Sequence, residues 1–195
     1  GNFWTVSDAI DAVGPMVLRY ALINAPYRQP IDFNQVLLDD AEKNYARLIE
    51  SIISAGGLSV ARQWEDIELL KNAEKSLIRG MDDDLNTRVA IAEMQSVVKI
   101  LRQANSSHDP MLASACIGWL SAYAGDVLGL LPDKESIQKM IGEASERRDE
   151  IRDKVESLIA EREEARSQRD WEEADRIRNE ISNLGVVIED RDTGA

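Results

Sequence analysis

The stretch DPMLASACIGWLSAYAGDVLGLL, residues 109–131, decides the fold class. It opens with Asp109–Pro110, a pair that favours a helix start because aspartate can cap free N–H groups and proline lacks one. The centre of the stretch, around Ile117 and Trp119, is apolar nearly all round. A helix without a polar face is buried, so we expect residues 111–131 to form the central helix of a bundle.

The segments before this stretch have the three-to-four-residue apolar spacing of amphipathic helices, separated by short joints. The expected helices cover residues 5–13, 16–25, the segment between Asn34 and Gly56, residues 60–78 with Gly80 as the stop, and residues 89–101. Only 5% of the 195 residues are aromatic, and 11 Gly and 5 Pro provide few turns. This composition disfavours an all-β sandwich or barrel and favours a mainly α fold.

Composition also excludes several classes of function. The single cysteine, Cys116, permits no internal disulfide, and with the single histidine, His108, leaves too few soft ligands for a structural zinc site. We expect Cys116 to be an inert core residue and His108 a surface loop residue. No apolar run has the length of a membrane span, and the N-terminus lacks a signal-peptide pattern. We therefore expect a cytoplasmic protein that does not bind a membrane.

The formal net charge of −13 argues against broad electrostatic capture of nucleic acid. Any contact with a nucleic acid must therefore be local.

The acidic run Asp82–Asp84 precedes Leu85, Asn86 and Thr87. One interpretation is a solvated loop followed by a helix cap. The alternative is a site for a divalent cation, which would need carboxylates from other elements.

The composition changes after Pro132, where aromatic residues become rare and charged residues dominate. Residues 137–165 keep a heptad-like apolar spacing, which predicts a long, narrowly amphipathic helix or a coiled-coil arm. Asp170 to Glu173 has the pattern of a capping box and predicts a second helix that ends at Gly185. Residues 186–188, Val-Val-Ile, are the most strand-like run in the chain.

Five strings, in order, resemble the C-terminal region of cysteinyl-tRNA synthetases, from just after the KMSKS loop to the anticodon-reading end. They are GNFWTV (residues 1–6), PMVLRY (15–20), YRQPIDF (27–33), MDDDLNT (81–87), and RDWEEADRIR with LGVVIED (169–178 and 184–190). The sequence departs from the family pattern at Gly14, Pro26 and Arg88, and it ends at Ala195 where family members usually continue through another strand.

The resemblance implies an antiparallel helical bundle followed by a small α+β anticodon-binding domain. The expected divisions are a connecting segment over residues 1–33, a DALR-like bundle over 34–131 and an anticodon-binding domain over 132–195.

The resemblance also implies the residues that read the anticodon: Arg166, Trp171, Asp175 and Asp190. A splayed-out base can stack on an indole ring such as that of Trp171. Guanine donors suit a carboxylate, and cytosine acceptors suit the donor fork of Arg166. Trp171 and Asp175 share a helix face, and Arg178, three residues further on, could contact phosphate. The structural alternative is that Trp171 is a core residue and that Asp175 and Arg178 form a solvated pair.

The partners implied are tRNA(Cys) and the upstream catalytic domain of the same protein, with no DNA. No HIGH-type signature, KMSKS loop or zinc-ligand set occurs in the sequence. We therefore expect no catalytic residue, metal or cofactor in this chain, which alone should be inactive, whereas ATP and zinc are implied for the full-length ligase. The competing hypothesis is a stand-alone helical interaction protein that pairs with a partner helix through residues 137–165 and does not bind RNA.

Overall fold

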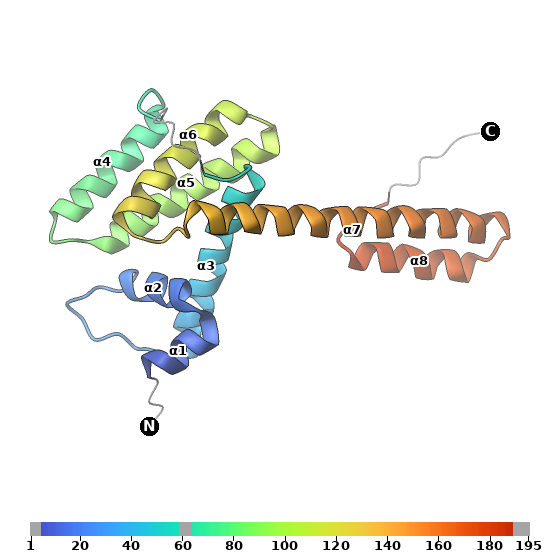
Figure 1. Ribbon diagram of the computed structural model, residues 1–195, viewed down its shortest axis with the longest axis horizontal. Helices are drawn as coiled ribbons and strands as arrows, with labels where there is room; N and C mark the ends of the chain where they lie inside the picture. The colour runs from blue at the N-terminus through green and yellow to red at the C-terminus, as the bar shows by residue number, and fades with distance from the viewer. Residues whose placement is uncertain (1–4, 59–63, 189–195) are drawn as a thin grey trace. The chain divides into compact units, whose positions relative to one another are not determined.

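The computed structural model describes residues 5–58 and 64–188 and shows a helical chain (Figure 1). It divides into two compact units, Gly1–Ile141 and Gly142–Ala195. We describe each unit by itself.

The described part of the first unit is a bundle of helices around one continuous core. Its helices are α1 (Val6–Val13), α2 (Pro15–Ile23), α3 (Gln35–Ser54), α4 (Glu68–Asp82), α5 (Thr87–Ser107), α6 (Pro110–Leu120), the π-helix η1 (Ser121–Val127) and the first turns of α7 (Lys134–Ser167). Helix α5 packs against α3, α4 and α6. The bundle predicted from the apolar spacing is confirmed.

Capping side chains fix several of these helix starts. Thr5 and Asp8 form a reciprocal capping box at α1. The side chain of Asn34 accepts a hydrogen bond from the backbone N–H of Leu37 at 3.0 Å, and Asp109 does the same for Leu112. These bonds satisfy N–H groups that have no partner within the helix, so the starts predicted at these positions are correct.

Gly80 does not stop α4, contrary to the prediction. The helix continues to Asp82, and a Cβ placed on Gly80 would lie 2.7 Å from Val89 on α5. The glycine is therefore required by the close approach of two helices. Val60, where this helix was expected to begin, lies outside the described residues, and α4 itself begins at Glu68.

The central helix also differs from the prediction in its second half. Helix α6 is buried on nearly all sides, as expected, but it passes into a π-helical turn at Ser121. In this turn the Tyr123 ring packs against Trp119, with 4.8 Å between the ring centroids. Beyond the turn, Arg19 of α2 donates two hydrogen bonds to the carbonyl oxygen of Leu128, at 3.0 and 3.1 Å, and so ties α2 to the end of the turn.

The second unit contains the rest of α7 and the helix α8 (Trp171–Asn183), which lie side by side as a hairpin (Figure 1). Its apolar cluster joins Val155 and Leu158 of α7 to Ile177 and Ile181 of α8. In the first unit, Ile137 of α7 belongs to the bundle core. The apolar stripe of the long helix is thus occupied within the chain, which disfavours the hypothesis of a coiled-coil arm that binds a partner helix.

The expected α+β character of the C-terminal domain is not confirmed. Residues 186–188 are neither helical nor paired in a strand, and no strand occurs among residues 5–58 and 64–188. Val186 and Ile188 instead pack their side chains against the α7–α8 cluster. A β-rich run forms a strand only with a partner for its backbone groups, and the residues expected to supply one, from 189 onward, lie outside the described residues. No helix in the described chain combines the length and apolarity needed to cross a bilayer.

Candidate nucleic-acid interface

The turn between α7 and α8 places the sequence-predicted residues near one end of the hairpin. Arg169 adopts a left-handed backbone conformation with φ of 63°, which reverses the chain. The Asp170 side chain then accepts a hydrogen bond from the backbone N–H of Glu173 at 3.1 Å and caps α8. This half of the predicted capping box is confirmed. Glu173 does not complete it, because its carboxylate binds Arg176 instead.

Trp171 is the first residue of α8, and 59% of its surface is exposed. It is therefore not a core residue, and its indole ring is available to stack on a planar ligand. Asp175 and Arg178 are also exposed and, at offsets of four and seven residues, lie on the same face of the helix. Among the described residues, neither Asp175 nor Arg178 forms a side-chain hydrogen bond or ion pair, so they do not form the solvated pair considered above.

Arg166 lies in the last turn of α7 and is exposed. It precedes Asp170, the residue that caps α8, by four positions. The sequence-predicted residues Arg166, Trp171, Asp175 and Arg178 thus belong to one hairpin. Asp190, the remaining predicted residue, lies outside the described residues.

Arg162 is a buried cation that the sequence reasoning missed. It is 9% exposed and lies one turn before Arg166 on α7. A signal was present, because Arg162 falls in the register of the apolar stripe, four residues after Leu158 and three before Ala165. An arginine at such a position is placed against the neighbouring helix rather than in solvent.

Other charges on the hairpin neutralise one another. Arg176 donates two hydrogen bonds to Glu173, at 2.7 and 2.8 Å, and also contacts Glu180, which pairs with Lys154 of α7 at 3.3 Å. The hydrogen bond from Arg176 lowers the pKa of the Glu173 carboxyl below its usual value. The charge of Arg176 is thus paired with carboxylates of the protein. Arg178, by contrast, lies on the same face of α8 as Trp171 and Asp175.

The acidic run of the first unit is part of a polar contact between two of the segments that resemble the synthetase family. Asp84 accepts hydrogen bonds from the Tyr27 hydroxyl and the Arg28 guanidinium, both at 2.8 Å. Asp82 ends α4, and Asp83 follows it as the C-cap. Within the described residues no group of three potential metal ligands occurs. The geometry thus favours a loop over a cation site, but the cap predicted with that loop does not form, because the Asn86 side chain makes no capping hydrogen bond at the start of α5.

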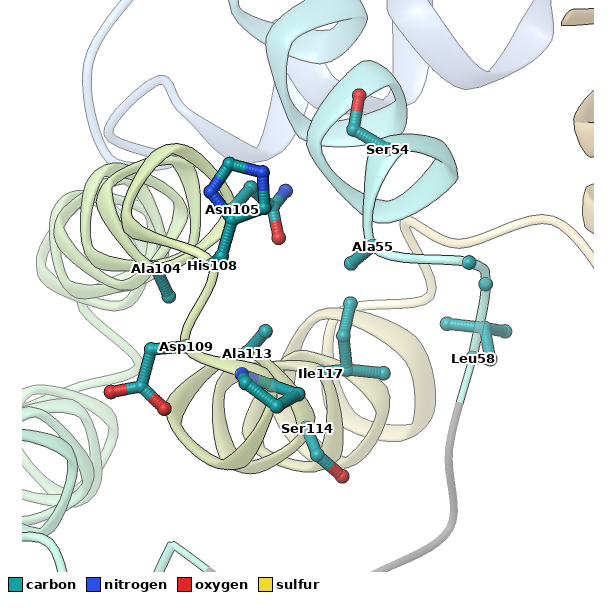
Figure 2. Close-up of a pocket in the computed structure, with 13 residues that line it drawn as sticks. Ser54, Ala55, Leu58, Ala104, Asn105, His108, Asp109, Ala113, Ser114 and Ile117 are labelled. Atoms are coloured by element: carbon teal, nitrogen blue, oxygen red, sulfur yellow. The ribbon is translucent and has the colours of Figure 1, made fainter.

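A hollow of about 510 Å³ lies where α3 and α5 end and α6 begins, and His108 and Asp109 line it (Figure 2). Figure 2 shows that the rest of its wall is formed mainly by small side chains such as Ala55 and Ala113. His108 is exposed and adopts the left-handed conformation of a helix C-cap, which makes it the surface loop residue that was expected.

Cys116 lies nearby in α6 but is completely buried. Burial, reinforced by the negative charge of Asp109, raises the pKa of its thiol to about 12. Very little thiolate therefore exists near neutral pH, which makes Cys116 an unreactive core residue as expected.

Two family models match the chain. Residues 148–195 match the cysteinyl-tRNA ligase anticodon binding domain, and residues 77–132 match the DALR domain. The first match contains the α7–α8 turn with Arg166, Trp171, Asp175 and Arg178. The second contains the end of α4 and all of α5 and α6.

Curated proteins similar to the chain are cysteine–tRNA ligases. The one from Laribacter hongkongensis is 35% identical over 191 residues, which cover 97% of this chain and 38% of the relative. A ligase from Legionella pneumophila is 34% identical over 196 residues, and that of Beutenbergia cavernae is 34% identical over 205 residues. Both alignments cover all of this chain, but only 39% and 41% of the relatives. The chain therefore spans about two-fifths of the length of these relatives.

Proposed function

Because the chain belongs to the cysteine–tRNA ligase family and corresponds to its C-terminal region, we propose that it binds tRNA(Cys) and reads its anticodon. The observation that carries this proposal is the exposed indole of Trp171 at the capped start of α8, beside Asp175 and Arg178. A core tryptophan would contribute to stability, whereas an exposed one offers a flat apolar surface to a ligand.

The chemistry of this face suits a single-stranded RNA loop. An unstacked base can lie on Trp171 while the Asp175 carboxylate accepts hydrogen bonds from the N–H groups on a guanine edge. Arg178 can bind phosphate, and Arg166 can donate to a cytosine or to the backbone. Asp190 belongs to the proposal through the family resemblance.

The wider proposal concerns the whole protein. We assign residues 1–33 to a connecting segment, 34–131 to a bundle that braces the tRNA, and 132–195 to the anticodon reader. The protein would act in the cytoplasm, in ATP-dependent cysteinylation by a catalytic domain outside this chain. Zinc does not fit the residues present, since the single cysteine is buried and the single histidine caps a helix, so we assign neither zinc nor ATP to them.

Binding of an anticodon stem-loop by variants of the chain tests this proposal. Trp171→Ala and Asp175→Asn should each weaken binding of a tRNA(Cys) stem-loop by roughly 1–3 kcal/mol, because each removes a stacking or hydrogen-bonding contact with a base. Fluorescence anisotropy with labelled RNA measures the effect.

Glu172→Gln is the matched control, because it removes the same charge as Asp175→Asn from an exposed neighbouring position on α8. Equal affinities of all variants that remain folded would contradict the proposal.

A further inference from the structure

The turn that joins α7 to α8 carries a backbone strain that glycine would relieve. Arg169 has a φ of 63°, in the left-handed region. Two hydrogen bonds close the end of α7 around it: the Arg169 N–H donates to the carbonyl oxygen of Arg166 at 3.1 Å, and the Asp170 N–H donates to that of Ala165 at 2.9 Å. Helices that end in this way usually have glycine at the left-handed position, because a Cβ there lies too close to the following carbonyl oxygen. Arginine at this position therefore costs stability.

The same pair of hydrogen bonds closes three other helices, α3, α5 and α8. The left-handed residue is Gly56 after α3 and Gly185 after α8, whereas it is His108 after α5. Histidine is one of the few residues besides glycine that are enriched in this conformation. Arginine has no such preference, so its presence in the fourth turn needs another reason.

Contacts within the described chain do not offset this cost. The Arg169 side chain is exposed and forms no hydrogen bond or ion pair with any residue that the structure describes. Four carboxylates lie within five positions of it in the sequence. Those of Glu164, Asp170 and Glu173 each accept a hydrogen bond from another group. The guanidinium is therefore available to a ligand outside the chain.

Arg169 lies within reach of any nucleotide bound at Trp171. The two residues are two positions apart, so their Cα atoms are separated by at most about 7 Å. A guanidinium binds a phosphate through two parallel N–H donors, and this contact is stronger than a hydrogen bond between neutral groups.

We propose that Arg169 binds the phosphate of the nucleotide whose base stacks on Trp171, and that the strained arginine is retained for this contact. Functional sites are where proteins keep residues that local conformational preference disfavours. The inference rests on the proposed function, to which it adds a residue outside the set that reads the bases.

Arg169→Gly and Arg169→Asn test the inference, because both remove the guanidinium and both new side chains suit the left-handed conformation. His108→Gly is the matched control, since it relieves the same kind of turn at the end of α5, in the other compact unit. Binding of a tRNA(Cys) stem-loop by the whole chain is measured by fluorescence anisotropy at several salt concentrations. Hydrogen exchange of the α8 amides reports the stability of the hairpin.

The Arg169 variants should bind RNA more weakly although their hairpin is at least as stable. In Arg169→Gly, exchange of the α8 amides should slow by up to about fivefold. Both variants should bind about tenfold more weakly at low salt, and the slope of log Kd against log salt should fall by about one. His108→Gly should change neither α8 exchange nor RNA binding.

Three results would overturn the inference. The first is unchanged RNA binding in both Arg169 variants. The second is a loss of binding in Arg169→Gly alone, because chain flexibility rather than the missing guanidinium would then explain it. The third is weaker binding together with faster α8 exchange in both variants, which would make Arg169 a structural residue of the turn.

The inference and the anticodon proposal fail separately, because a phosphate is the same in every loop. The loss in the Arg169 variants should be equal for the tRNA(Cys) stem-loop and for one with its first anticodon base changed. If the unmodified chain binds both loops equally while the Arg169 variants bind both more weakly, the anticodon proposal is wrong and the phosphate contact stands. If discrimination persists and the Arg169 variants bind normally, only the inference is wrong. A folded chain that binds neither loop at low salt contradicts both.

Discussion

Gly80 shows how one residue can control the packing of two helices. Its missing Cβ allows Val89 to approach closely, so Gly80→Ala should destabilise the first unit by roughly 1–3 kcal/mol through overpacking. Gly142→Ala is the control, because a Cβ there meets nothing within 4 Å and alanine is the better helix former. It should stabilise the protein by up to about 1 kcal/mol. Urea unfolding followed by circular dichroism measures both changes, and a neutral or stabilising Gly80→Ala would contradict this role.

The residues that the sequence identified correctly act through local chemistry. Asn34, Asp109 and Asp170 cap helices because a short polar side chain can reach N–H groups three residues ahead. Gly80 was misinterpreted because its role depends on Val89, which lies on the next helix. The exposure of Trp171 likewise could not be read from the helix pattern, since a tryptophan in the first turn can face the core or the solvent.

At the scale of the element, the α7–α8 hairpin depends on a small apolar cluster. Leu158 is 6% exposed within that cluster, whereas its neighbour Ile159 is 38% exposed. Leu158→Ala should therefore destabilise the hairpin by roughly 2–5 kcal/mol, and Ile159→Ala by well under half as much.

Hydrogen exchange of the α8 amides measures this difference at the hairpin itself. Faster exchange is expected in Leu158→Ala, with little change in α5 or α6, which belong to the other compact unit. Equal exchange in the two variants would mean that the hairpin does not depend on the Leu158 contact.

The long helix shows both the strength and the limit of periodicity as a guide. The spacing from Ile137 to Ala165 predicted α7 correctly, but it could not show that Ile137 packs in the first unit while Val155 and Leu158 pack against α8. The strand prediction for residues 186–188 was wrong within the described chain, because β propensity does not supply a pairing partner. The π-helical turn at Ser121 has no counterpart in the apolar pattern.

At the scale of the whole molecule, the net charge of −13 has to be reconciled with an RNA partner. A local surface can meet this requirement: the Trp171 face of α8, which would read bases. Contacts shared between such a surface and other parts of the same protein add up through their linkage, so each can be weak alone. The family and most of the bundle could be predicted from the sequence.

The most direct test of the anticodon proposal is the discrimination of anticodons by the unmodified chain. Fluorescence anisotropy is measured with a tRNA(Cys) stem-loop and with the same stem-loop carrying a different first anticodon base, at low and moderate salt. We predict weaker binding of the altered loop by roughly 1–3 kcal/mol at both salt concentrations, because a wrong base leaves buried polar groups without partners. Equal binding of the two loops by the folded chain would contradict the account.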